Sequence, residues 1–138
     1  MKKYILSFVI ILMFSMAANA QVSIIVNKSV SESSLDAGKL KSIYTLKTTK
    51  WADGSKIVVF NLKTKGESQN KFYGHIGSKA NDLKKTWMKA QLTGEGKAPK
   101  SLGSEDEVVQ KVASTPGAIG FVSTSKVSDD VKTIATIK

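Results

Sequence analysis

The sequence predicts a single small α/β domain built in three layers, with helices covering both faces of a mixed sheet. Short, apolar, β-branched runs alternate with segments whose apolar residues recur at helical spacing. Residues 104–122 show this most clearly, because a helix, a tight turn and a buried strand follow one another there. The chain has 138 residues and no cysteine, so its core must be stable without disulfides.

Residues 1–20 have the pattern of a secretory signal peptide. Lys2–Lys3 precede an apolar run, Tyr4–Met16, and Ala18–Ala20 offers small residues for cleavage. The apolar run is shorter than the roughly 20 residues that a membrane-spanning helix needs. We therefore expect one exported, periplasmic domain over residues 21–138, with no membrane span after cleavage.

The first half of the mature chain predicts two strands and a helix between them. Val22–Val26 and Ile57–Asn61 are β-branched, apolar runs typical of covered strands. Between them, about Asp36–Thr45 has amphipathic helical spacing, with Leu40 as an apolar anchor. A turn is expected at Asp53–Gly54, where glycine can adopt a positive φ.

Two helices and a loop are expected next. One helix begins near Glu67 and ends at Gly77, and its apolar face includes Phe72. Another extends over about Ser78–Gln91. The glycine- and lysine-rich stretch Leu92–Gly103 is predicted to be a loop without regular structure.

The last part of the chain predicts a helix and two strands. Ser104 can cap the helix, and Glu107 three residues later completes a capping box. Pro116–Gly117 end the helix before a short buried strand, Ala118–Val122. The alternating segment Lys132–Lys138 is expected to form an edge strand.

The charge of the chain is strongly positive. It carries 21 basic residues, all of them lysine, against 11 acidic residues, which gives a net charge of +10. This excess attracts anions, but lysine lacks the planar fork with which arginine grips phosphate. The lysines are scattered rather than gathered into a motif that fits a nucleic-acid groove. We therefore expect no nucleic-acid partner.

Several residues that could carry chemistry have simpler structural explanations. His75 is the sole histidine, so the sequence offers it no second histidine or cysteine for a triad or metal site. Gly94–Lys97 lacks the first glycine and the Ser/Thr of a phosphate-binding P-loop. Asp129–Asp130 is expected in a turn, and Trp51 and Trp87 in the core. The sequence therefore predicts no enzyme activity, no cofactor and no metal site.

Three groups of residues share their order and spacing with a known protein family. They are Leu35, Leu40, Ile43, Tyr44, Trp51, Asp53, Gly54 and Ile57; then Trp87, Leu92, Thr93, Gly94, Gly96 and Pro99; and finally residues 116–122. In this pattern the chain resembles the phosphate-type periplasmic solute-binding proteins of ABC importers. The resemblance covers about residues 24–122 and implies one lobe of a type II periplasmic binding protein.

The resemblance also implies an anion-binding site at the start of the helix near Glu67. Family members have an arginine-containing loop and a Ser-Gly-Thr sequence there, and the site implied in this chain comprises Lys65, Gly66, Ser68 and Gln69. Free N–H groups and hydroxyls at a helix N-terminus bind oxyanions. Because Glu67 opposes an anion and no arginine is present, we expect weak binding of phosphate or a similar anion.

Two functions remain open at this point. One is a solute-binding-like module that contacts a small inorganic anion, works with an ABC permease, and completes its cleft by pairing with a second copy. The other is an interaction or structural module of the cell envelope that has lost its ligand. Calorimetry with phosphate would separate them.

Overall fold

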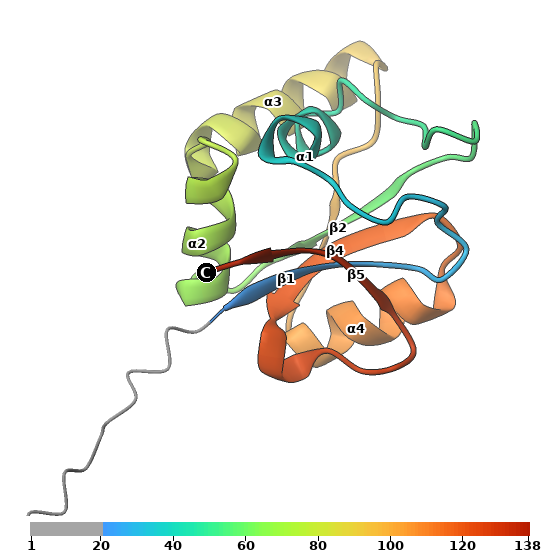
Figure 1. Cartoon of the computed structure of the whole chain (residues 1–138). Coiled ribbons are helices and arrows are strands. Elements are labelled where there is room, and N and C mark those ends of the chain that lie inside the picture. Colours follow the sequence, from blue (N-terminus) through green and yellow to red (C-terminus); the bar gives the residue numbers. More distant parts are fainter. Residues whose placement is uncertain (1–20) are drawn as a thin grey trace, which may run out of the picture.

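The computed structural model describes residues 21–138, so the predicted signal peptide lies outside the described residues. Five strands form one mixed sheet in the order β3-β2-β4-β1-β5 (Figure 1). β1 is antiparallel to β4 and β5, whereas β2 is parallel to β3 and β4. The strands are β1 (Val22–Val26), β2 (Val58–Leu62), β3 (Lys100–Leu102), β4 (Ala118–Ser123) and β5 (Lys132–Ile137).

Helices cover both faces of this sheet, which confirms the predicted three-layer architecture (Figure 1). The helices are α1 (Ala37–Tyr44), α2 (Glu67–His75), α3 (Ala80–Thr93) and α4 (Glu105–Ser114), with a short 3₁₀ turn at Thr124–Lys126. The first three lie on one side and α4 lies on the other. Within residues 21–138, no helix has the length and apolar character needed to span a membrane.

The two covered faces meet at β4, whose alternate residues pack in opposite directions. The ring of Phe121 stacks on that of Phe72 in α2, with centroids 4.2 Å apart. On the other face, a Cβ placed on Gly120 would lie 2.7 Å from a methyl carbon of Val108 in α4. Glycine is therefore needed at this position so that α4 can approach the sheet.

Both tryptophans lie in the core, as predicted. Trp87 donates its indole N–H to the carbonyl of Tyr44 at 2.7 Å, and Trp51 donates to the carbonyl of Gly117 at 2.9 Å. The Tyr44 hydroxyl in turn donates to the carbonyl of Phe60 at 3.0 Å. Burial, with a smaller contribution from Tyr73, raises the pKa of Tyr44 well above its ordinary value, so the hydroxyl keeps its proton. These hydrogen bonds tie α3 to α1 and α1 to the sheet.

Two local predictions were wrong in detail. The predicted loop Leu92–Gly103 contains β3, which pairs with β2 at the edge of the sheet. This strand has only three residues, which is too short for an alternating apolar pattern to be recognised in the sequence. At α4, Ser104 does cap the backbone N–H of Glu107, but the Glu107 carboxylate accepts from Gly103 N at 3.2 Å, not from the cap residue. Asp129–Asp130 lies in a turn, as expected.

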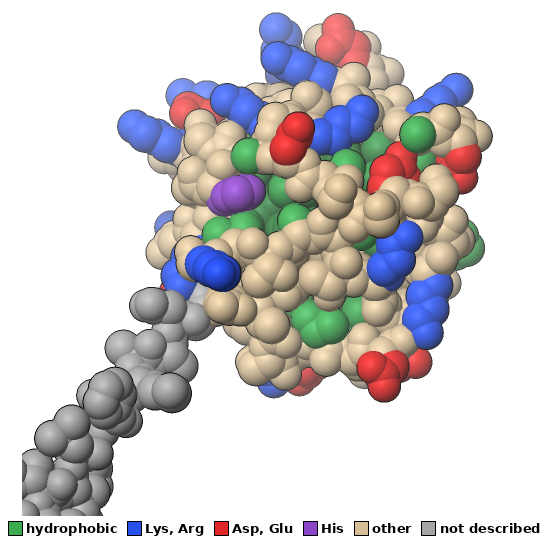
Figure 2. Space-filling model, in the orientation of Figure 1, with side chains coloured by type: hydrophobic (Ala, Val, Ile, Leu, Met, Phe, Trp, Pro, Cys, Tyr) green, Lys and Arg blue, Asp and Glu red, His purple; other side chains and the backbone are tan. Residues whose placement is uncertain are grey.

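The lysines are distributed over the surface. On the face shown in Figure 2, blue side chains are scattered mainly around the rim, with tan and red surface between most of them, and they form no continuous basic stripe. A small apolar recess near the middle of this face lies among these separated charges (Figure 2). The excess positive charge therefore acts as a diffuse field on this face and builds no groove lined by cations.

Candidate functional site

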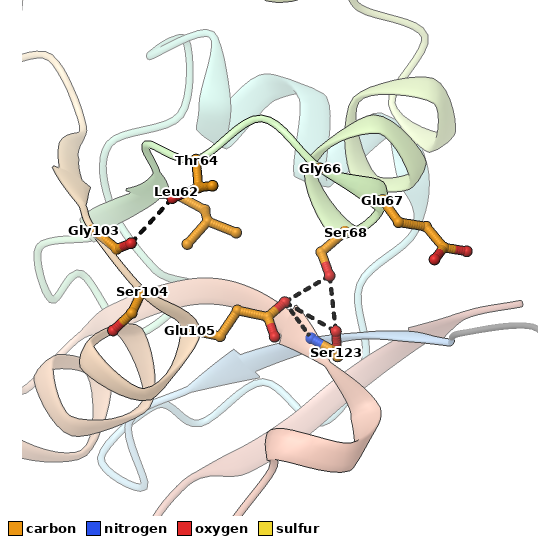
Figure 3. Close-up of a pocket in the computed structure, with 9 residues that line it drawn as sticks. All are labelled: Leu62, Thr64, Gly66, Glu67, Ser68, Gly103, Ser104, Glu105 and Ser123. Carbon is orange, nitrogen blue, oxygen red and sulfur yellow. Dashed lines mark hydrogen bonds between the residues drawn. The ribbon is translucent and has the colours of Figure 1, made fainter.

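A pocket of about 420 Å³ opens at the carboxyl ends of β2 and β3 (Figure 3). In open α/β sheets, ligands bind beyond the carboxyl ends of parallel strands. Helix α2 begins just after β2, and helix α4 begins just after β3, so the N-termini of both helices border the same space. We call it the carboxyl-end pocket. Its lining residues are Leu62, Thr64, Gly66, Glu67, Ser68, Gly103, Ser104, Glu105 and Ser123.

The two helix N-termini differ in how they are capped. At α4, the Ser104 hydroxyl accepts the N–H of Glu107 at 3.2 Å. At α2, the cap residue is Gly66, which has no side chain with which to accept a hydrogen bond. The first N–H groups of a helix lack intrahelical partners, and the helix dipole gives that end partial positive charge. The start of α2 therefore favours an acceptor from elsewhere.

A carboxylate occupies the centre of the polar cluster between the helices. One oxygen of Glu105 accepts from the Ser68 hydroxyl at 2.6 Å, from the Ser123 backbone N–H at 3.0 Å and from the Ser123 hydroxyl at 3.0 Å. The two serine hydroxyls also lie 2.9 Å apart. Figure 3 shows the Glu105 side chain pointing toward both serines. The cluster therefore holds an oxyanion that belongs to the protein itself.

This arrangement joins three elements that are far apart in the sequence. Ser68 comes from the first turn of α2, Glu105 from the first residue of α4, and Ser123 from the end of β4. Because Glu105 is the first residue of α4, its charge also lies at the positive end of that helix dipole. Charge-assisted hydrogen bonds are about twice as strong as neutral ones. Glu105 therefore fastens the start of α2 to the sheet.

Glu67 contributes a second carboxylate to the lining but has a different position. Its side chain points away from the Glu105 cluster (Figure 3) and forms an ion pair with Lys71 one turn later, at 3.4 Å. None of the nine residues that line the pocket is a lysine. The pocket of this basic protein is therefore lined by acidic side chains and hydroxyls.

The structure brings only part of the predicted anion site together. Gly66 and Ser68 line the carboxyl-end pocket, and the Ser68 hydroxyl is already engaged. Lys65 is exposed and does not line it. Gln69 is buried, and its amide donates to the carbonyl of Leu62 at 2.8 Å, where it supports the end of β2.

The remaining polar groups near this end of the sheet serve the fold. The Tyr73 hydroxyl donates to the Asn61 side-chain oxygen at 2.8 Å, inside the core. Burial raises the pKa of Tyr73, although the hydrogen bonds with Asn61 and Gln69 oppose that shift. His75 is exposed at the end of α2. Among residues 21–138, no group of three acidic or histidine side chains is arranged to hold a metal ion.

Sequence reasoning missed Glu105 and Ser123 as members of this site. Glu105 reads as an ordinary acidic residue in the first turn of a helix, and Ser123 as a residue that follows a strand. A partial signal was present, since three strand-to-helix or strand-end junctions each carry a serine. Nothing local indicates that these junctions converge on one carboxylate.

Comparison with solved structures shows the same fold in phosphate-transport proteins. A protein assigned as a phosphate ABC transporter substrate-binding protein, with bound phosphate, from Clostridium perfringens matches with a TM-score of 0.69 and 23% identity, over 83% of this chain and 45% of its own. An ABC-type phosphate transport receptor from Vibrio cholerae matches with a TM-score of 0.67 and 22% identity, over 83% and 46%. PstS from Borrelia burgdorferi matches with a TM-score of 0.61 and 14% identity, over 84% and 47%.

The chain shares the fold of the matched part of these proteins, a mixed sheet with helices on both faces. This confirms the fold that the sequence motifs implied. The chain spans less than half the length of these solved proteins. No family model matches the sequence, and no curated protein matches it. At these identities the likeness establishes the architecture, and the chemistry must be argued from the residues of this chain.

Proposed function

We propose that this protein is an exported solute-binding-like lobe that binds a small oxyanion, phosphate, weakly in the carboxyl-end pocket. The observation that carries the proposal is the Glu105 cluster, in which donors from α2 and β4 surround a carboxylate oxygen. A carboxylate and a phosphate present the same kind of acceptor, so donors placed for one suit the other. The solved proteins of the same fold from Clostridium perfringens and Vibrio cholerae are described as phosphate-transport proteins.

Weak binding follows from the same cluster. An incoming anion must displace the Glu105 carboxylate or share its donors, and each hydrogen bond to a charged group contributes about 1.5–3 kcal/mol. The carboxylate of Glu67 adds repulsion at the start of α2. The pocket is also open to water, which screens charge. The diffuse positive charge of the chain draws anions near, but the pocket supplies little further attraction.

The wider assignment has four parts that rest on the relatives and on the sequence. We propose that the protein acts by binding, not by catalysis, and that it is located in the periplasm after loss of residues 1–20. An ABC permease is the partner proposed by analogy with the transport proteins of the same fold. Pairing of two copies would close the pocket with a second surface.

Isothermal titration calorimetry of the mature protein with phosphate and with sulfate tests the ligand. We expect millimolar phosphate affinity in the native protein and about a tenfold gain in Glu105→Gln, because the variant removes the competing charge. Ser68→Ala in the Glu105→Gln background should reverse the gain.

Asp106→Asn is the matched control. It removes the same charge from the same helix turn, but Asp106 pairs with Lys126 and lies outside the pocket. It should leave phosphate binding unchanged. Absence of heat from both the native protein and Glu105→Gln at millimolar phosphate would refute anion binding.

The occupied donors also favour the second candidate function. If Glu105 holds the serines permanently, the lobe is an interaction or structural module of the cell envelope without a small ligand. In that case Glu105→Gln lowers stability but confers no phosphate binding. The same titration therefore distinguishes the two functions.

A further inference from the structure

A second pocket, of about 540 Å³, lies at the opposite end of β2. It is bordered by the segment after α1, the start of β2 and the segment between α3 and β3. In Figure 1 these segments lie to the right of α1 and α3. We call it the amino-end pocket. Its lining residues are Leu46, Thr48, Thr49, Lys56, Ile57, Val58, Val59, Glu95, Gly96, Lys97, Ala98, Pro99 and Lys100.

The short pairing between β2 and β3 leaves room for this pocket. Their ladder starts at Phe60 opposite Lys100 and does not continue toward the amino end of β2. Val58 and Val59 consequently remain half-buried and line the pocket. Pro99, the residue before β3, has no N–H with which to continue the ladder toward the amino end of β2. The space beside the two valines is therefore left open to a small molecule.

Leu46, Ile57 and Val59 give the pocket an apolar wall, and Leu46 takes part in it with a strained backbone. Leu46 has a φ of 65°, in the left-handed region that glycine normally occupies after a helix. A side chain in that region costs on the order of 1–2 kcal/mol. A Cβ on Gly96 would be 3.7 Å from a terminal carbon of Leu46, so this leucine extends toward the opposite wall. The leucine therefore adds apolar surface at a position where glycine would be easier to accommodate.

The charges around the apolar wall are mainly positive. Lys56, Lys97 and Lys100 belong to the lining and are exposed, whereas Glu95 is the single acidic residue there. Within residues 21–138, the two ion pairs are Lys71–Glu67 and Lys126–Asp106, and neither involves these three lysines. An apolar interior with cations at its edge is complementary to a ligand that has an apolar body and an anionic head. A volume of several hundred Å³ is typical of small-molecule pockets.

We propose that the amino-end pocket binds the anion of a medium-chain fatty acid. The chain packs against the apolar wall formed by Leu46, Ile57 and Val59, and the carboxylate is held beside Lys97 and Lys100. This site is separate from the carboxyl-end pocket and shares no lining residue with it. A ligand in the amino-end pocket therefore does not touch the residues proposed to bind phosphate.

Two-dimensional ¹H–¹⁵N NMR titration with sodium decanoate, below its micelle-forming concentration, tests the proposal. We expect saturable shifts at the amides of Gly96 and Val59, and none at Gly66 or Ser123. Acetate, which has the head without the chain, should not produce saturable shifts at these amides.

Two variants locate the ligand. Gly96→Leu places a side chain in the pocket where the nearest atom is at ordinary contact distance, so it should abolish binding without unfolding the domain. The double variant Lys97→Gln/Lys100→Gln should weaken binding about threefold to tenfold. Lys84→Gln/Lys85→Gln on α3 removes equal charge elsewhere and should change nothing. The proposal is overturned if decanoate gives no saturable shift at Gly96 and Val59, if acetate shifts them equally, or if Gly96→Leu still binds.

Discussion

The two ends of β2 carry pockets that differ in how their charges are compensated. At the carboxyl end, the Glu105 carboxylate is surrounded by donors from Ser68 and Ser123. At the amino end, lysines surround an apolar wall with one acidic residue among them. At the end where such folds bind ligands, the protein's own carboxylate therefore occupies the donors, whereas the opposite end leaves lysines and apolar surface accessible to a ligand.

The largest expected effect concerns the backbone beneath the amino end. In Gly117→Ala, the new methyl group would lie 2.3 Å from the Lys56 carbonyl oxygen, at a φ of 76°. We expect a loss of about 3 kcal/mol in the free energy of unfolding, measured by urea denaturation. Gly54→Ala is the control, because its φ is 86° but no atom lies within 4 Å of the new methyl. It should cost about 1 kcal/mol. Equal losses would show that the close approach is unimportant.

The carboxyl end should respond next most strongly. Glu105→Ala leaves the hydroxyl of Ser68 and the N–H of Ser123 without their shared acceptor, and we expect a loss of about 2 kcal/mol. Asp106→Ala in the same turn loses only an exposed ion pair and should cost about 0.5 kcal/mol or less. Thermal unfolding at low phosphate concentration measures both. A loss in Glu105→Ala no larger than that in Asp106→Ala would mean that the cluster does not fasten α2.

A smaller effect is expected beneath the carboxyl end. Tyr73→Phe removes the hydroxyl that donates to the buried Asn61 side chain, and we expect a loss of about 1 kcal/mol in chemical denaturation. Thr93→Ala removes an exposed hydroxyl that donates to the backbone carbonyl of Lys89 and should be nearly neutral. If both variants behave alike, burial does not make the Tyr73 hydrogen bond important.

The smallest effect is a pH dependence in the turn near the amino end. Hydrogen bonds from the Ser55 hydroxyl and from the Ser55 backbone N–H lower the pKa of Asp53 below its ordinary value. A lowered pKa in the folded state contributes stability above the unfolded pKa, and that stability is lost as the pH falls through the folded pKa. Ser55→Ala should raise the pKa of Asp53, measured by carboxyl-carbon NMR titration. An unchanged pKa would assign the shift to the backbone alone.

Local patterns were sufficient to predict most of the fold. The alternation of apolar runs and helical segments predicted four of the strands and all four helices, because each element carries its own burial pattern. Strand β3 was not predicted, because its three residues depend on pairing with the neighbouring strand for their extended conformation. The Leu46 conformation was also unpredictable, since leucine has no local preference for a positive φ.

The candidate site was less accessible to sequence reasoning. The helix start at Gly66 and Ser68 could be predicted, because a strand followed by a helix places N–H groups at that junction. The role of Glu105 depends on contacts 37 and 18 residues away along the chain, with Ser68 and Ser123. The tertiary packing of α4 against β4 decides which of these acceptors and donors meet. No local sequence motif encodes that packing.

The position of β1 in the sheet has a consequence for how the chain folds. This first strand lies between the last two, pairing with β4 and β5 through residues about a hundred positions later. Pairings so distant in sequence form slowly, because a long loop must close before either neighbour contributes. An interior strand of the sheet therefore has no partner until the chain has been synthesised as far as β4, and its other edge stays open until β5 follows. Until then the sheet cannot close around β1, and the polypeptide can still pass unfolded through a narrow channel.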